Sequence, residues 1–252
     1  MTTEHFTSPQ GRRLAHRRFA PARSDLTYVW LCGFKSDISG TKVLRLEAWC
    51  RENGHGFLAF DYSGHGDSDG AFEDGTISAW RQDALDAVDA LTDGPLVLVG
   101  SSMGGWMVLL TALARRERIA GMVLIAPAPD FTEKLMWPEF TPRQQEEILN
   151  DGLTLRPSDY GEPYPITRAL IEDGRTWQIL DAPIDLECPV RILQGAEDPD
   201  VPWQHAFRLV EAMSTRDLAF TLVKDGDHRL SREQDIARLL ATCAELAAVT
   251  IP

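Results

Sequence analysis

The chain alternates between continuous apolar runs and stretches in which apolar residues recur every three or four positions. Continuous runs are typical of strands buried on both faces of a parallel sheet, and the wider spacing predicts amphipathic helices. The predicted strands occupy 28–32, 57–60, 96–99, 119–126, 190–193 and 218–223. The predicted helices occupy 41–52, 76–91, 203–213 and 231–247.

Strand and helix alternate often enough to predict an α/β fold, a mostly parallel twisted sheet with helices on both faces. Ahead of it, a Ser-Pro-Gln-Gly turn at 8–11 predicts a hairpin within 4–20. Gly54 follows one helix and predicts its end. Ser231 and Gln234 hold capping-box positions, which predicts that the last helix begins there.

One interval, 127–189, interrupts the alternation because it contains no strand-like apolar run. It leaves the sheet at the carboxyl end of a strand, where ligands bind in such sheets, and long insertions of this kind are often lids. We therefore expect a core of 1–126 and 190–252 with a lid of 127–189. Its aromatic residues, Trp137 and Trp177 among them, are predicted to contact substrate; alternatively they pack the insertion onto the core.

Composition narrows the class of protein. The net charge is −13 over 252 residues, which argues against nucleic acid and anionic membrane surfaces as partners. The four cysteines are far apart, without a C-x-x-C pair or metal-ligand spacing, so we expect free thiols, no metal and no cofactor. The start of the sequence lacks the apolar core of a secretory signal, and no run is long enough to span a membrane. We therefore expect a cytoplasmic protein.

The stretch 96–105, LVLVGSSMGG, carries the chemistry. A buried strand, the pattern G-x-S-x-G and a helix are typical of a nucleophile elbow, a sharp strand-to-helix turn that exposes a serine. Of the two adjacent serines, only Ser102 has a glycine two residues away on each side, at Gly100 and Gly104. Such five-residue matches also arise by chance, so the rest of the chain must supply a base and an acid.

The partners of an elbow serine follow in the order acid, then histidine. Only His205 and His228 come after Ser102. His205 falls inside a predicted helix, whereas His228 follows the last predicted strand, where a base can reach the elbow. The acid should follow the strand at 190–193, and three candidates lie there.

Those candidates are Glu197, Asp198 and Asp200. Asp227, next to His228, is too close in sequence to orient its ring. Within the proposed mechanism, the serine attacks an acyl carbon while the histidine takes its proton. The oxyanion would be held by the N–H of Met103, at a helix N-terminus, and by that of Phe34, in the loop after the strand at 28–32.

These stretches resemble the α/β-hydrolase superfamily over nearly the whole chain. The resemblance is carried by 60–64, by 99–106, by Asp198 with Val201-Pro202-Trp203, and by Asp227-His228-Arg229. It implies Asp198 as the acid, with Asp200 as the alternative. Within the superfamily the chain is similar to acyl-protein thioesterases, a group that includes a mitochondrial depalmitoylase and acyl-glucuronide esterase.

The resemblance implies hydrolysis of an acyl thioester or ester, with an S-acylated protein as one candidate substrate. Relatives of that group carry an organelle-targeting leader, whereas this sequence begins almost at its first predicted strand, so their compartment is not carried over. A small-molecule carboxylesterase is the alternative enzyme. A binding module that keeps the fold without turnover is the alternative of another class. The sequence does not indicate acyl length or oligomeric state.

Overall fold

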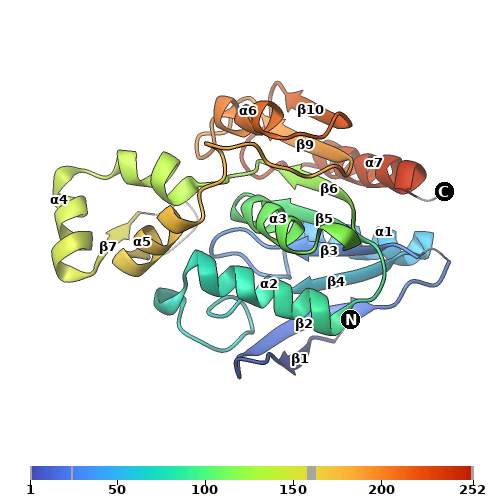
Figure 1. Cartoon of the computed structure of the whole chain (residues 1–252), viewed down its shortest axis with the longest axis horizontal. Helices are drawn as coiled ribbons and strands as arrows, with labels where there is room; N and C mark the ends of the chain where they lie inside the picture. Colours follow the sequence, from blue (N-terminus) through green and yellow to red (C-terminus); the bar gives the residue numbers. More distant parts are fainter. Residues whose placement is uncertain (1, 24, 158–162, 251–252) are drawn as a thin grey trace.

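The computed structural model describes residues 2–23, 25–157 and 163–250, and it contains one eight-stranded sheet with strand order β1-β2-β4-β3-β5-β6-β9-β10 (Figure 1). The antiparallel strands are β1 (Glu4–Thr7) and β2 (Arg13–Phe19), at one edge of the sheet. The parallel strands are β3 (Thr27–Leu31), β4 (Gly56–Phe60), β5 (Leu96–Ser101), β6 (Ile119–Ile125), β9 (Val190–Gly195) and β10 (Leu218–Val223).

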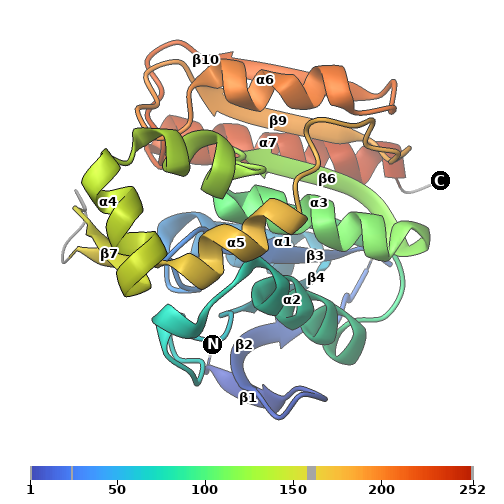
Figure 2. The same cartoon turned by 60° about the vertical axis from the view of Figure 1, so that its left-hand side comes forward.

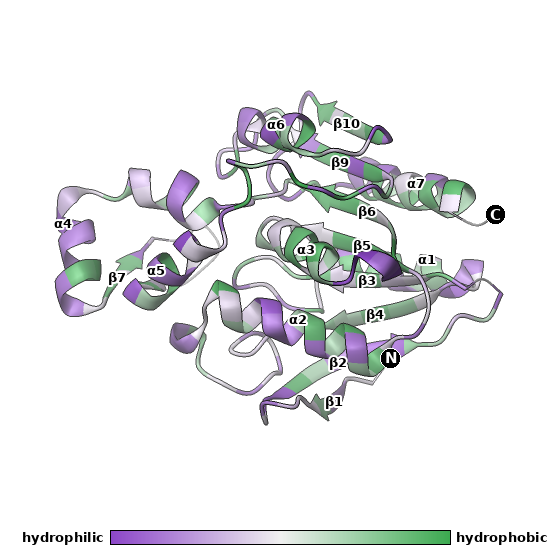
Figure 3. Cartoon of the chain, in the orientation of Figure 1, coloured by the Kyte–Doolittle hydropathy of each residue, from purple (hydrophilic) through white to green (hydrophobic). Residues whose placement is uncertain are grey.

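Helices cover both faces of the sheet, as predicted. On one face lie α2 (Ile77–Leu91), α3 (Met103–Ala114) and α6 (Trp203–Ala212), and on the other lie α1 (Thr41–Asn53) and α7 (Glu233–Thr250) (Figure 2). Because both faces are covered, the central strands β3, β4 and β5 are buried at every position. Figure 3 shows the corresponding concentration of apolar residues on the sheet.

The register places the carboxyl ends of the parallel strands at one edge. Leu31 pairs with Gly100, Ser101 with Ile125, and Gly195 with Val223. Loops that leave β3, β5, β9 and β10 therefore start side by side. This alignment brings together segments that lie more than a hundred residues apart in the chain.

The predicted hairpin and most predicted boundaries are confirmed. Gly54 ends α1 with φ of 77°, a left-handed conformation that glycine adopts without strain. The predicted start of α7 is wrong. The helix begins at Glu233, with Ser231 outside it and donating to the Arg229 carbonyl oxygen (3.0 Å). Instead, the Asp235 carboxylate, in the first turn of the helix, accepts from the N–H of Arg232 (3.3 Å).

The inserted segment, defined as residues 127–189, projects beyond the carboxyl edge of the sheet (Figure 1). Its described elements are η3 (Thr132–Met136), η4 (Trp137–Glu139), α4 (Pro142–Glu146), η5 (Glu147–Asp151), β7 (Leu153–Arg156), β8 (Tyr164–Thr167) and α5 (Arg168–Thr176). A capping box formed by Thr141 and Gln144 starts α4. The β7–β8 hairpin was not predicted, because its strands are short and interrupted by polar residues.

Within the described residues, no helix combines the length and apolar character that a membrane crossing requires. The cysteines are free thiols, as predicted: Cys32, Cys50 and Cys243 are buried and Cys188 is half-buried.

The packing of α3 against the end of β3 is tight enough to test. A Cβ at Gly104 would collide with the Leu31 carbonyl oxygen. We expect Gly104→Ala to lower the free energy of unfolding by about 1–3 kcal/mol, since the backbone must shift, measured by urea unfolding. Gly121→Ala is the matched control, because its Cβ would lie 3.4 Å from the flexible Leu246 side chain. Equal losses at both positions would contradict this account of the packing.

Candidate active site

Ser102 occupies a strained turn between β5 and α3. Its φ of 57° and ψ of −121° lie outside the regions that non-glycine residues favour. Backbone hydrogen bonds on both sides hold it there. Its N–H donates to the Ile125 carbonyl oxygen (2.9 Å), and its own carbonyl oxygen accepts from the N–H groups of Gly105 (2.9 Å) and Ala128 (3.1 Å).

The two glycines of the motif permit this turn. A Cβ at Gly100 would collide with the carbonyl oxygen of Gly104, and a Cβ at Gly104 would collide with that of Leu31. The first turn of α3 therefore rests directly on the ends of β3 and β5. The G-x-S-x-G spacing predicted this close approach from the missing side chains.

The structure brings His228 to Ser102, as the order along the chain predicted. The Nε2 of His228 lies 3.1 Å from Ser102 Oγ, and its Nδ1 lies 2.9 Å from Asp198 Oδ2. The Asp198 side chain is fully buried, and that of His228 is 17% exposed. A buried carboxylate that accepts from Nδ1–H leaves Nε2 free to accept the serine proton.

The structure also distinguishes the acid candidates Asp198 and Asp200 by their hydrogen bonds. Asp198 Oδ1 accepts from the N–H groups of Asp200 (2.9 Å) and Val201 (2.8 Å), and Oδ2 accepts from Gln194 Nε2 (3.0 Å). Asp200 thus supports Asp198 through its backbone. Gln194 was not predicted as a site residue. The sequence gives only a weak indication of this role, because a glutamine at the end of a strand is usually exposed. In the structure Gln194 is fully buried.

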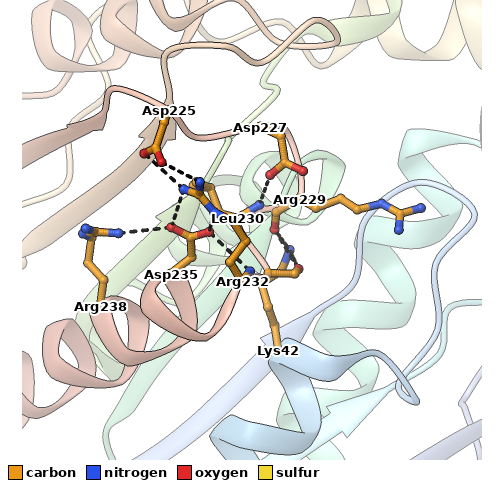
Figure 4. Close-up of polar contacts among 9 residues, drawn as sticks. Lys42, Asp225, Asp227, Arg229, Leu230, Arg232, Asp235 and Arg238 are labelled. Atoms are coloured by element: carbon orange, nitrogen blue, oxygen red, sulfur yellow. Dashed lines mark hydrogen bonds and ion pairs between the residues drawn. The ribbon is translucent and has the colours of Figure 1, made fainter.

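The loop that carries His228 is braced from within and from α1. Asp227 Oδ1 accepts from the Leu230 N–H (2.9 Å), so Asp227 caps the loop instead of orienting the histidine ring. Lys42, from α1, donates its Nζ to the Arg229 carbonyl oxygen and to Ser231 Oγ (Figure 4). Burial lowers the pKa of Lys42 to about 8.

A second brace joins the same loop to α7. Arg232 donates to Asp225 Oδ2 (2.7 Å) and to Asp235 Oδ2 (2.7 Å), and Arg238 donates to the other oxygen of Asp235 (3.2 Å) (Figure 4). The loop is therefore held at both ends while its middle presents His228 to Ser102.

The predicted oxyanion donors both lie beside Ser102. Met103 is the first residue of α3, so its N–H lacks an acceptor within the helix. Phe34 lies in a turn whose first residue, Gly33, packs beside Ser102; a Cβ on Gly33 would lie 3.5 Å from Ser102 Cβ. Over the described part of the chain, neither N–H donates to another protein atom.

A cavity of about 830 Å³ opens onto Ser102 and His228. Four apolar side chains of the inserted segment line it and are called the apolar wall: Phe131, Leu135, Met136 and Tyr164. Charged side chains line it as well, among them Lys35, Asp37 and Arg156, and the Lys35 ammonium lies over the Tyr164 ring (5.2 Å to the centroid). The cavity therefore offers both apolar and charged contacts next to Ser102.

Trp137 and Trp177 are not among the described residues that line this cavity. The Trp137 ring packs against Phe140 (6.2 Å between centroids) and under the Arg175 guanidinium (4.9 Å). Trp177 donates its Nε1–H to Ser78 Oγ (2.7 Å). Trp137 therefore packs within the inserted segment, and Trp177 joins that segment to α2. These contacts match the alternative in which the aromatic residues pack the insertion onto the core.

His205 is excluded as the base by its position. It is buried in α6, and its Nε2 lies 2.8 Å from the Pro129 carbonyl oxygen. Burial lowers its pKa, which keeps the ring neutral. Pro129 follows β6, so His205 anchors the beginning of the inserted segment.

Among the described residues, Asp198, Asp200 and His228 have ligand atoms close enough, within 4.8 Å of one another, to hold a metal ion. However, both oxygens of Asp198 already accept from N–H donors. A carboxylate whose oxygens accept from N–H donors is better suited to orient a histidine than to bind a cation.

Comparisons of the sequence and of the structure with known proteins both find alpha/beta hydrolases. The sequence matches the alpha/beta hydrolase family over residues 48–242. It is 36% identical to the human palmitoyl-protein thioesterase ABHD10, mitochondrial, over 220 residues, which cover 86% of this chain and 72% of that protein. The mouse alpha/beta hydrolase domain-containing protein 10 superposes with a TM-score of 0.90 at 32% identity, covering 98% of this chain and 99% of that one. A protein from Agrobacterium vitis S4 superposes with a TM-score of 0.94 at 46% identity, covering 97% and 98%.

The comparisons contradict the predicted cytoplasmic location. The thioesterase relatives from five mammals carry the word mitochondrial in their names. The prediction was wrong because it rested on missing secretory and membrane segments, and their absence does not separate the cytoplasm from a mitochondrial compartment. The expected fold and the expected hydrolase class are confirmed. The chain belongs to the alpha/beta hydrolase family, and the protein is a hydrolase.

Proposed function

We propose that this hydrolase cleaves acyl thioesters or esters through an acyl-enzyme on Ser102. The observation that carries the proposal is the continuous hydrogen-bond chain from Ser102 Oγ through His228 to the buried Asp198. Serine, histidine and aspartate in this geometry generate a nucleophile at neutral pH, where a free serine hydroxyl is too weak a nucleophile to react.

The proposed reaction has two steps. In the first, Ser102 Oγ attacks the acyl carbon and transfers its proton to His228 Nε2, which passes it to the departing thiolate or alkoxide. In the second, water attacks the acyl carbon and gives a proton to the same nitrogen, which passes that proton to Ser102 Oγ as the carboxylic acid leaves. Asp198 stays ionised and stabilises the imidazolium in both steps.

The negative charge on the carbonyl oxygen requires donors that are already in place. We assign this role to the N–H groups of Met103 and Phe34, which border the cavity beside Ser102. The N-terminus of α3 adds a favourable dipole. Each such donor typically contributes about 10²- to 10³-fold in rate.

A long acyl group is the substrate best suited to the cavity. Its apolar wall, from Phe131 to Met136 and Tyr164, would contact the acyl chain. The relatives named palmitoyl-protein thioesterase support an S-acylated protein as substrate. In this proposal residues 127–189 act as a lid on a core of 1–126 and 190–252. A monoglyceride lipase, 29% identical over 209 residues, supports oxygen esters as the alternative.

The role of Ser102 can be tested by covalent labelling. We expect Ser102→Ala to lower thioester and ester hydrolysis by about 10⁴-fold or more and to abolish reaction with a fluorophosphonate probe. The protein should keep its circular dichroism spectrum. Mass spectrometry of the labelled wild-type protein should locate the adduct on Ser102; an adduct elsewhere would remove the basis of the proposal.

The assignment of the acid can be tested with a matched pair. Asp198→Asn should lower kcat by about 10³- to 10⁴-fold, because an amide favours the wrong histidine tautomer. Asp200→Asn should cause a much smaller loss, since Asp200 supports the site through its backbone N–H. The reverse order of the two losses would assign the acid to Asp200.

Substrate preference provides a test of the cavity walls. We expect Phe131→Ala to shift the preferred acyl length, measured as kcat/KM across thioesters and oxygen esters of two to sixteen carbons (about the lengths that a cavity of this class can hold). Trp137→Ala is the control, since Trp137 does not line the cavity. An unchanged profile in Phe131→Ala, or an equal shift in both variants, would contradict the proposed acyl wall.

A further inference from the structure

The turn that carries Phe34 depends on a residue thirty positions further along the chain. Gly33 to Ser36 form a β-turn closed by a hydrogen bond from the Ser36 N–H to the Gly33 carbonyl oxygen (3.1 Å). Lys35, the third residue, has φ of 54°, as a type II turn requires. Glycine normally occupies that position, because a residue with a Cβ is strained there.

His65 supplies the contact that favours this strained turn. Its Nε2 lies 3.1 Å from the Lys35 nitrogen, and its Nδ1 lies 3.3 Å from the Ser63 carbonyl oxygen. A backbone N–H can only donate and a carbonyl oxygen can only accept. The proton of His65 is therefore on Nδ1, and Nε2 accepts from the Lys35 N–H.

The surroundings keep His65 neutral and fixed. Its ring is packed edge-on against Tyr62 (5.6 Å between centroids), Phe72 (5.3 Å) and Trp80 (5.1 Å), and the residue is only 4% exposed. Burial lowers its pKa to about 4, against smaller opposing effects of the Ser63 carbonyl and the Asp37 carboxylate. Nε2 therefore remains an acceptor at neutral pH.

The hydrogen bond acts on the one peptide that distinguishes two possible turns. Type I and type II turns differ by a flip of the central peptide, here the one between Phe34 and Lys35. A flip would return Lys35 to negative φ and release its strain, but it would turn the Lys35 N–H away from His65. The contact thus selects the type II form.

The conformation of this turn affects the proposed reacting atoms through Phe34 and Gly33. Gly33 packs directly beside Ser102. The Phe34 N–H belongs to the peptide next to the one that flips, so a flip, which changes ψ of Phe34, would move this N–H by shifting the residues on either side. The Phe34 ring also contacts Phe131 and Tyr164 of the apolar wall (5.7 and 5.8 Å between centroids). A shift of this turn would therefore move both the proposed oxyanion donor and part of the acyl site.

We propose that His65 is a positioning residue that holds the Gly33–Ser36 turn in its type II form and so keeps Phe34, with its N–H, in place beside the oxyanion. The proposal rests on the proposed function of Ser102 and Phe34. No group of His65 touches the substrate. Its effect is on the orientation of a donor that matters most in the transition state.

The test is a double-mutant cycle between His65 and Lys35. His65→Phe keeps an aromatic ring among Tyr62, Phe72 and Trp80 and removes the acceptor. We expect it to lower kcat by about 10²-fold, the effect of misplacing a group by about 1 Å, with a smaller change in KM. His65→Gln, whose Oε1 can replace Nε2 as the acceptor, should recover most of the loss.

Lys35→Gly separates turn orientation from general packing. Glycine favours the type II turn by itself, so adding His65→Phe to Lys35→Gly should cost less than about threefold in kcat, a strong coupling between the two positions. A merely structural role for His65 predicts the same loss in both backgrounds. That result, or full activity of His65→Phe alone, would overturn the inference.

Ser102→Ala is measured in parallel so that the two proposals fail separately. If Ser102→Ala is inactive while His65→Phe keeps full kcat, only the role of His65 is rejected. If Ser102→Ala is active, the proposed function is rejected and the role of His65 falls with it. Thermal unfolding of every variant, followed at the same protein concentration, distinguishes lost activity from lost folding; His65→Gln serves where His65→Phe does not fold.

Discussion

The close approach of α3 to the ends of β3 and β5 is the constraint on which the rest of the site depends. Gly100 and Gly104 remove the side chains that would separate these elements. The chain can then turn sharply enough to hold Ser102 at φ of 57°. Conformational strain of this kind costs of order 1–3 kcal/mol and persists only where the surroundings over-determine it. Here the covered parallel sheet supplies those surroundings.

Once the serine is fixed, the register of the sheet determines where its partners must lie. Gly195 and Val223, the last residues of β9 and β10, are neighbours, so the loops after them leave the sheet together. One loop carries Asp198 and the other carries His228. Their side chains meet because each loop is braced by buried or charged contacts, through Gln194 on one side and Lys42 on the other.

The inserted segment contributes apolar side chains to the cavity beside Ser102. Phe131 and Tyr164 meet Phe34 in one aromatic cluster that joins this segment to the proposed oxyanion turn. In the proposed function, binding of an acyl chain along that wall and the position of the donor beside Ser102 consequently depend on the same packing. This connection gives a physical route by which a change in the insertion would affect kcat as well as affinity.

The sequence by itself determined the features that are local or periodic. Buried strands, covering helices and the G-x-S-x-G turn depend on residues a few positions apart, and the order of serine, acid and histidine follows from the order of the strands. Trp137 and Trp177 were predicted at the cavity because aromatic residues in an insertion suit a ligand, but apolar character alone does not give a direction. The start of α7 was predicted two residues too early, because the Asp235 side chain accepts from the Arg232 N–H at the beginning of the helix.

Only the tertiary structure decided which long-range partners meet. His65 lies in a glycine-rich loop thirty residues after Lys35, and only the fold brings its Nε2 to the Lys35 N–H. Gln194 looked like an ordinary polar residue, yet it is buried against Asp198. Hydrogen bonds of this kind depend on distance and direction in space, which residue spacing along a chain does not encode. The fold and the proposed reacting groups were therefore predictable from the sequence, and the contacts that orient these groups were not.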